Sequence, residues 1–155
     1  MCVLFVGSLR VLSFVGPAHT RIARPVNLVM KESPKSPDAV RKRFEGVVGC
    51  EPKHQTWAQS TAEDLLKRYR VARVAADPPR VPAFAEPAGW DGFVYLRLHG
   101  SPRVYWSGYT PEYLDRIATF LRATAGPPTW VIFDNTAAGQ ALENAWALHR
   151  RLFEA

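Results

Sequence analysis

Ionisable side chains stand at or just after the ends of four short apolar runs in the chain. They are Glu51, Asp77, the pair Arg97 and His99, and Asp134. Carboxylates act as general acids, general bases or metal ligands, and a histidine moves protons near neutral pH. An arginine holds carboxylate or phosphate groups through paired hydrogen bonds. These residue types therefore favour a site for catalysis or for binding a ligand.

The candidate site residues fall into two groups. The predicted catalytic residues are Glu51, His54, Asp77, Arg97, His99 and Asp134. Among them, Glu51 or His99 is the expected acid or base, and Arg97 is expected to hold an anion. The predicted ligand-binding residues are Lys53, Trp57, Tyr105, Tyr109 and Asn135. Tyr105 and Tyr109, with Trp106 in the same loop, either stack on a base or a sugar ring or pack as a loop that seals the mouth of the barrel.

Each candidate also has a purely structural interpretation. Glu51 can form a buried ion pair with Arg97, and Asp77 can cap the proline turn beside it. Residues 134–136 are of the types that commonly begin helices, and His99 can bond a backbone carbonyl. Ionisable residues occur at several strand ends, and this coincidence favours a functional site.

The sequence contains no recognisable metal or cofactor motif. Three carboxylates and two histidines can bind a divalent ion, but their spacing matches no zinc signature. The chain also lacks a glycine-rich phosphate loop and a nucleophile motif of the G-x-S-x-G type. We therefore predict no resident metal, keep a divalent ion as the weaker alternative, and leave the cofactor unassigned.

Four strands must position the candidate residues. The apolar runs predict strands over 47–51, 71–77, 93–99 and 129–133. A capping box from Ser60 to Glu63 predicts a first helix, and Thr110 begins a second. A third helix is marked by the apolar stripe Ala141, Ala145, Leu148 and Leu152. This order predicts an α/β fold with parallel strands, whose carboxyl ends meet at one rim.

Residues 1–45 differ from the rest of the chain. They hold eight of the 20 basic residues but three of the 14 acidic ones, so most of the net charge of +6 lies there. Four prolines interrupt them, and only 38–45 is compatible with a short helix. We interpret 1–45 as an irregular basic leader, assigned to the chain in error or unrelated to the rest of it, and 46–155 as the folded part.

The cysteines and the hydropathy pattern bear on the compartment. Cys2 and Cys50 match no metal or redox spacing, and we expect both to be free thiols. Free thiols fit a reducing compartment. No apolar stretch approaches the roughly 18–20 residues that a membrane span needs. The sequence thus predicts a cytoplasmic protein without a membrane partner.

Five segments of the chain resemble the domain of unknown function 72 family, the YecE-like proteins. They are Glu51–His54 with Trp57, Val74–Asp77, Tyr95–Gly100, Tyr105–Tyr109, and Phe133–Gly139 with Ala141, Asn144 and Ala145. The resemblance runs from about residue 46 to residue 153. The R-L-H-G and F-D-N-T-x-x-G motifs are its most specific parts. Lys53 stands where the family usually has arginine, and Thr56 where it usually has serine.

The resemblance implies a TIM-barrel-like fold with these motifs at the ends of the later strands, and it implies no established activity. A full family member is longer, and the early strand motifs are missing from residues 1–45. We therefore expect a truncated chain that forms the C-terminal half of a barrel, with about four parallel strands. A half-barrel has two open sheet edges, so we expect self-association through them.

Three functional hypotheses arise from the sequence. The first is an enzyme-like barrel of unknown reaction that takes a small-molecule or phosphate-bearing ligand at the strand ends. The second is a remnant without chemistry, or a half-barrel that serves assembly. The third is a barrel that binds or processes nucleic acid, which draws on Arg41–Arg43 and on the aromatic loop. The nearly neutral charge of 46–155 weakens this third hypothesis.

Overall fold

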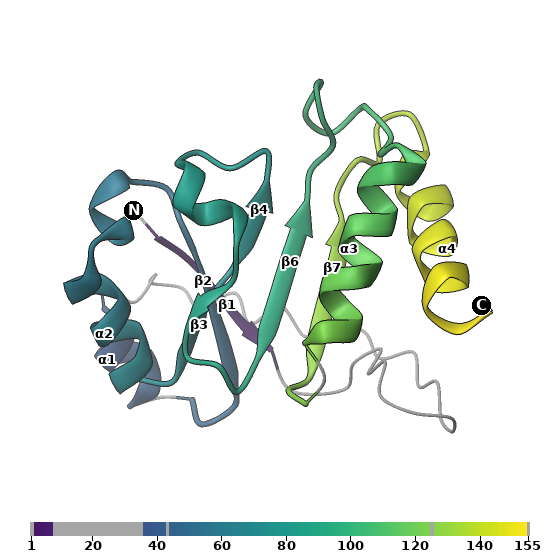
Figure 1. Cartoon of the computed structure of the whole chain (residues 1–155). Helices are drawn as coiled ribbons and strands as arrows, with labels where there is room; N and C mark the ends of the chain where they lie inside the picture. The colour runs from purple at the N-terminus through teal and green to yellow at the C-terminus, as the bar shows by residue number, and fades with distance from the viewer. Residues whose placement is uncertain (1, 8–35, 43, 125, 155) are drawn as a thin grey trace.

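The computed structural model describes residues 2–7, 36–42, 44–124 and 126–154, which form a mixed α/β fold with parallel strands (Figure 1). The strands are β1 (Cys2–Gly7), β2 (Val47–Pro52), β3 (Val71–Arg73), β4 (Ala75–Asp77), β5 (Ala88–Gly89), β6 (Val94–Leu98) and β7 (Thr129–Phe133). The helices are α1 (Pro37–Arg41), α2 (Ser60–Arg68), α3 (Pro111–Ala123) and α4 (Gln140–Phe153), with 3-10 turns η1 (Gln55–Ala58) and η2 (Pro82–Ala85).

The strands form two small sheets, and the chain passes from the first into the second between β3 and β4. One has the strand order β1-β2-β3-β5 and the other β4-β6-β7. Only Val74 separates β3 from β4, and its N–H donates to the Cys50 carbonyl over 2.9 Å. The parallel pairs β2–β3, β4–β6 and β6–β7 confirm the four predicted parallel strands, with the predicted strand 71–77 divided at Val74. Among the described strands, the pairing closes no ring.

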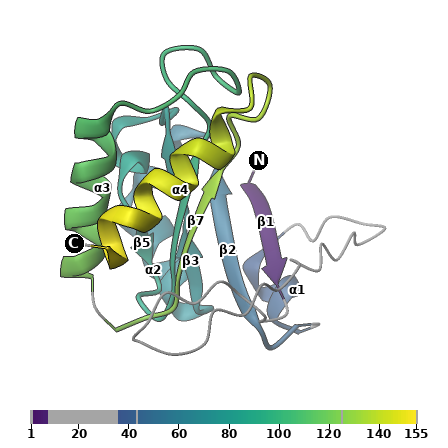
Figure 2. The same ribbon diagram turned by 90° about the vertical axis from the view of Figure 1, so that its right-hand side faces the viewer.

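The helices cover one face of the strands because alternate strand residues are apolar on that side. Val48, Cys50 and Val71 pack with Val40 of α1 and Leu66 of α2. Further along, the apolar residues of β6 and β7 pack against α3 and α4. Figure 2 shows α4 crossing in front of β7, with α3 beside it. This packing holds the parallel strands so that their carboxyl ends point the same way.

The opposite face of the strands holds an aromatic cluster. Phe93, Tyr95 and Trp130 meet edge to face, with ring centroids 5.3 to 6.1 Å apart. Ala72 and Val74 complete this buried layer. Such edge-to-face pairs add to the stabilisation from burial of the rings. This cluster lies on the same face as the candidate site, two to four residues before it along the strands.

The N-terminal segment is more regular than its sequence predicts. Residues 2–7 form β1, which pairs antiparallel with β2, and the short helix expected near 38–45 is α1 at Pro37–Arg41. The interpretation of an irregular leader is therefore wrong for these two pieces, and residues 8–35 lie outside the described ones. A six-residue apolar run does not by itself indicate which strand it will pair with.

Two of the three predicted helix starts need correction. Thr110 caps α3 as predicted, since its hydroxyl accepts from the Tyr113 N–H over 3.3 Å. The capping box at Ser60 does not form, because Gln59 is the N-cap and Glu63 pairs instead with Lys67 at 2.9 Å. Residues 134–136 do not begin α4, whose N-cap is Gly139 in a left-handed conformation.

The expectation of two free thiols is wrong as well, since Cys50 is disulfide-bonded. The prediction of a reducing compartment therefore loses the support that free thiols gave it. Within the described part of the chain, no helix has the length and hydropathy to cross a membrane.

A buried amide pair ties the last helix to the strand ends. Asn135 is fully buried, and its amide donates to the Ser107 carbonyl at 3.0 Å and to Asn144 Oδ1 at 2.8 Å. Asn144 Oδ1 also accepts from the Tyr109 N–H at 3.0 Å. The pair therefore joins the end of β7, the loop after β6 and α4.

Removing the acceptor of this pair should destabilise the fold. Asn144→Ala leaves two buried donors, the Tyr109 N–H and the Asn135 amide, without a partner, at a cost of about 1–3 kcal/mol each. Urea unfolding followed by tryptophan fluorescence measures the loss. The exposed neighbour change Glu143→Gln should stay within about 0.5 kcal/mol. Equal stability of the two variants would contradict this assignment.

Candidate functional site

Strand alternation brings four of the predicted residues to one face. Glu51 lies in β2, Arg97 in β6, and His99 and Asp134 directly follow β6 and β7. Parallel pairing sets Arg97 opposite Ile132, two residues before Asp134. Because residues i and i+2 of a strand share a face, these side chains point away from the helices. They meet at the carboxyl ends of the strands, as the sequence predicts.

Arg97 is the centre of this cluster. Its Nη1 lies 2.6 Å from Glu51 Oε2, and its Nε lies 2.6 Å from Asp134 Oδ2. The Glu51 side chain is 3% exposed, while those of Arg97 and Asp134 are each 23% exposed. A buried carboxylate requires such partners, because an uncompensated charge in the interior is strongly destabilising. The guanidinium thus connects the ends of β2, β6 and β7.

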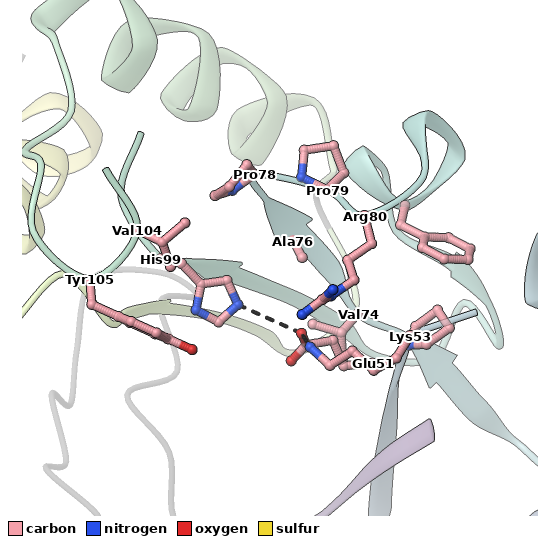
Figure 3. A pocket seen from close by; sticks show the side chains of 12 residues that line it. Glu51, Lys53, Val74, Ala76, Pro78, Pro79, Arg80, His99, Val104 and Tyr105 are labelled. Atoms are coloured by element: carbon pink, nitrogen blue, oxygen red, sulfur yellow. Dashed lines mark hydrogen bonds and ion pairs between the residues drawn. The ribbon is translucent and has the colours of Figure 1, made fainter. Parts of the chain in front are cut away.

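His99 lies between the same two carboxylates. Its Nδ1 is 3.3 Å from Asp134 Oδ2. Its Nε2 is 3.6 Å from Glu51 Oε1, the contact that the dashed line in Figure 3 marks. Lys53 also bonds Glu51 Oε1. On the other side, the Tyr105 ring meets the imidazole edge to face at 5.5 Å. The side chain of His99 is 8% exposed, so these neighbours determine its protonation.

The contacts shift the pKa values of the cluster. Burial opposes the charge of Glu51, but hydrogen bonds from His99, Lys53 and Arg97 outweigh it and lower the pKa to about 2. The hydrogen bond with His99 is the largest cause of the lowered pKa of Asp134. Hydrogen bonds to Asp134 and then to Glu51 raise the pKa of His99. Both carboxylates are therefore charged at neutral pH, and the imidazole favours its protonated form.

A pocket of about 210 Å³ opens beside the cluster. Glu51, Lys53 and His99 form its base, and Tyr105 lies on one wall. The residues 78–80, after β4, form the opposite wall, with Arg80 directed toward Glu51 (Figure 3). The pocket is thus polar at its base and borders on loops at its mouth, an arrangement typical of ligand sites in α/β proteins.

Five predicted site residues lie elsewhere. His54 is exposed and accepts from the Thr56 N–H at the start of η1, and Trp57 packs with the core beside α1 and α2. Asp77 follows the opposite alternation, since it pairs in register with Leu98 on the helix side. Its carboxylate lies near Tyr109 and Tyr113, whose pKa values are raised by burial and further by Asp77.

Tyr109 and Asn135 are buried on that helix side too. The Tyr109 hydroxyl accepts from the Gly100 N–H at 2.7 Å and donates to the Asp77 carbonyl at 3.2 Å. Both side chains therefore hold the loop after β6 rather than facing the pocket. The alternation of side chains along a strand was the available signal for Asp77. Ala76 shares a face with Val74, so Asp77 lies on the other face, away from the cluster.

Arg80 is a pocket residue that the sequence motifs do not single out. It comes after Pro78 and Pro79 in a loop beyond a strand, which is the usual position of ligand-binding residues, and this position was the available signal. Within the described residues, no group of three or more His, Cys, Asp and Glu side chains is arranged to hold a metal. The carboxylates of the cluster are instead bonded to cations.

Fold and site define an α/β protein with a charged cluster at the carboxyl ends of parallel strands. The sequence profile of the family described as protein of unknown function DUF72 matches residues 20–155, and the chain belongs to this family. The match includes residues 20–45, part of the segment that the sequence pattern suggested to be a leader.

Two solved structures of the same family share this fold. A family protein from Enterococcus faecalis V583 has a TM-score of 0.61 and 17% sequence identity, with 74% of this chain and 50% of that chain covered. One from Thermotoga maritima MSB8 has a TM-score of 0.58 and 22% identity, with 76% and 50% covered. The chain thus matches half the length of each relative. No curated protein matches it.

Glu51 should make the folded state sensitive to acid. Its pKa is about 2 in the folded state against an ordinary value of 4.5, so the unfolded state binds more protons between these values. The stability that Glu51 contributes is complete above about pH 4.5 and is lost as the pH falls toward 2, a loss on the order of 3 kcal/mol.

Urea unfolding at a series of pH values checks this dependence. The free energy of unfolding of the wild type should fall across that interval, and Glu51→Gln should show a shallower fall. Asp134, whose pKa is also lowered, leaves a residual slope of the same sign in the variant. Parallel curves for the two proteins would exclude Glu51 as the source.

Proposed function

We propose that the chain forms half of a TIM-barrel-like fold. Four parallel strands in chain order, with helices on one face, support this architecture. The two relatives, each matched over 50% of its length, support it further. In such folds the reactive groups lie at the carboxyl ends of the strands, which is where the charged cluster lies.

We propose further that this cluster is an acid–base site for a small molecule, with His99 as the group that transfers the proton. The observation that carries the proposal is the placement of His99 at the base of the pocket with a carboxylate near each ring nitrogen. The closer contact, from Nδ1 to Asp134, orients the ring. Nε2 makes the longer contact, 3.6 Å to Glu51 Oε1, and we assign it the exchange of a proton with a ligand.

The low pKa of Glu51 argues against that residue in this role. A group transfers protons best when its pKa lies near the working pH. With a pKa of about 2, Glu51 stays charged and serves to hold His99, Lys53 and Arg97. Arg97 forms ion pairs with two carboxylates, so we assign it the positioning of Glu51 and Asp134 in place of the anion-holding role.

The titration of His99 should reflect these contacts. Its pKa lies above the ordinary 6.5 in the wild type, and Asp134→Asn should lower it because Asp134 is the first cause of the increase. Histidine ring signals in NMR spectra report both values. A His99 pKa at or below 6.5 in the wild type would contradict the arrangement.

Catalysis is tested with small chromogenic substrates: 4-nitrophenyl phosphate, 4-nitrophenyl acetate and 4-nitrophenyl glycosides. Loss of a general acid or base typically costs about 10²–10⁴-fold in rate. His99→Gln should therefore reduce kcat/KM for the substrate that is turned over by at least about 10²-fold. His149→Gln, on α4, is the matched control. Turnover that survives His99→Gln would overturn the proposal.

A second proposal concerns assembly, and a separate observation favours it. The helix α4 exposes a stripe of large apolar side chains at helical spacing. They are Leu142, Trp146 and Phe153, which are 79%, 55% and 47% exposed. Among the described strands, β7 pairs only with β6, so its other edge is unpaired. We propose that two copies of the chain associate through this last strand–helix unit, because apolar stripes and open edges favour pairing with like surfaces.

Light scattering coupled to size-exclusion chromatography checks the assembly. The mass of the wild type should rise with concentration toward that of a dimer, and Trp146→Glu should remain monomeric at the same concentrations. Arg150→Gln, exposed on the same helix, should behave as the wild type. A wild type that is monomeric throughout would refute this association.

A further inference from the structure

Arg80 places a positive charge over the pocket. It lies in the loop after β4, it is exposed, and its side chain extends toward Glu51 and His99 (Figure 3). Within the described part of the chain, no hydrogen bond or ion pair engages its guanidinium. An arginine in this position can form two parallel hydrogen bonds to an oxyanion. Its charge is therefore available to a ligand that enters the pocket.

The charges of the site leave a positive excess at the pocket. The carboxylates of Glu51 and Asp134 are opposed by three permanent cations, Arg97, Lys53 and Arg80. The raised pKa of His99 adds to this excess when the ring is protonated. Arg97 balances both carboxylates from within the cluster. Lys53 pairs with Glu51 alone, and Lys53 and Arg80 both border the pocket. A negative group on the ligand would complete the charge balance.

Tyr105 faces these cations from the other wall, and its backbone is held in place. Its φ of +66° lies in the left-handed region, which is unusual for a residue of this size and strains the backbone. Two hydrogen bonds hold it there: its N–H donates to the His99 carbonyl at 2.6 Å, and its carbonyl accepts from the Ala137 N–H at 3.0 Å. Strain of this kind concentrates where a side chain must be aimed at a ligand. Tyr105, which is 52% exposed, forms a wall for the body of the ligand.

We infer that the pocket binds a small molecule through an oxyanion group, a phosphate or a carboxylate, which Arg80 and Lys53 hold beside His99. The inference rests on the proposed acid–base function and specifies its substrate class. The volume of about 210 Å³ is below the roughly 300–1,000 Å³ of sites for drug-sized ligands, so the ligand is a compact one. With its anion on Arg80 and Lys53, such a ligand presents its remaining atoms to Nε2 of His99.

Calorimetric titration with inorganic phosphate and, separately, with acetate tests the inference on the full chain. Saturable binding of either anion is expected, and the preferred one distinguishes a phosphate from a carboxylate ligand. Arg80→Gln should weaken the affinity by about tenfold or more, since it removes a charged bidentate contact. The matched control is Arg103→Gln, because Arg103 is exposed on the neighbouring loop, stacks over Trp106 at 4.3 Å and does not line the pocket.

The outcomes separate this inference from the proposed function. No saturable binding of either anion by the wild type, or equal affinities of Arg80→Gln and Arg103→Gln, would overturn the oxyanion site. His99→Gln should keep most of the anion affinity, since Arg80 and Lys53 remain, while it loses turnover. If turnover depends on His99 but no anion binds, the acid–base function stands and the oxyanion inference fails. If the anion binds through Arg80 and turnover is indifferent to His99, the acid–base function fails.

Discussion

The guanidinium of Arg97 joins the ends of three strands through its two ion pairs. Glu51 comes from β2 and Asp134 lies just after β7, and Arg97 reaches both from β6 over 2.6 Å. Without it, two carboxylates at one strand rim would repel each other and would raise each other's pKa values. Removing one partner of a buried ion pair typically costs about 3–5 kcal/mol. The position of His99 depends on both carboxylates, and therefore on Arg97.

Because Arg97 is occupied by carboxylates, the groups that can serve a ligand are those around it. Lys53 just after β2, His99 just after β6 and Arg80 in the loop after β4 border the pocket. The strands thus provide a charged base, and residues beyond the strand ends provide the contacts that we propose for a ligand. This arrangement is common in α/β proteins, where loops carry function on a rigid scaffold. It gives a family without an assigned activity a concrete site to test.

The far side of the sheet supports the same pocket. Tyr109 and Asn135 hold the loop after β6 through the Gly100 N–H and the Ser107 carbonyl. That loop carries Tyr105, the strained residue beside His99. A change in the buried amide pair of Asn135 and Asn144 would thus act on the pocket as well as on stability. Residues that touch no ligand are in this way part of the geometry of the site.

The sequence by itself determined the four parallel strands, the approximate positions of the four helices and the rim at which Glu51, Arg97, His99 and Asp134 meet. These depend on local information, since apolar runs and alternation are properties of neighbouring residues. Only the tertiary structure decided that Asp77, Tyr109 and Asn135 belong to the helix side, that β1 pairs with β2, and that Arg80 faces the pocket. Each of these depends on contacts between segments distant in the chain, which local patterns do not encode. The capping box at Ser60 shows the same limit. The Glu63 carboxylate forms an ion pair with Lys67 instead of bonding the backbone at the start of the helix.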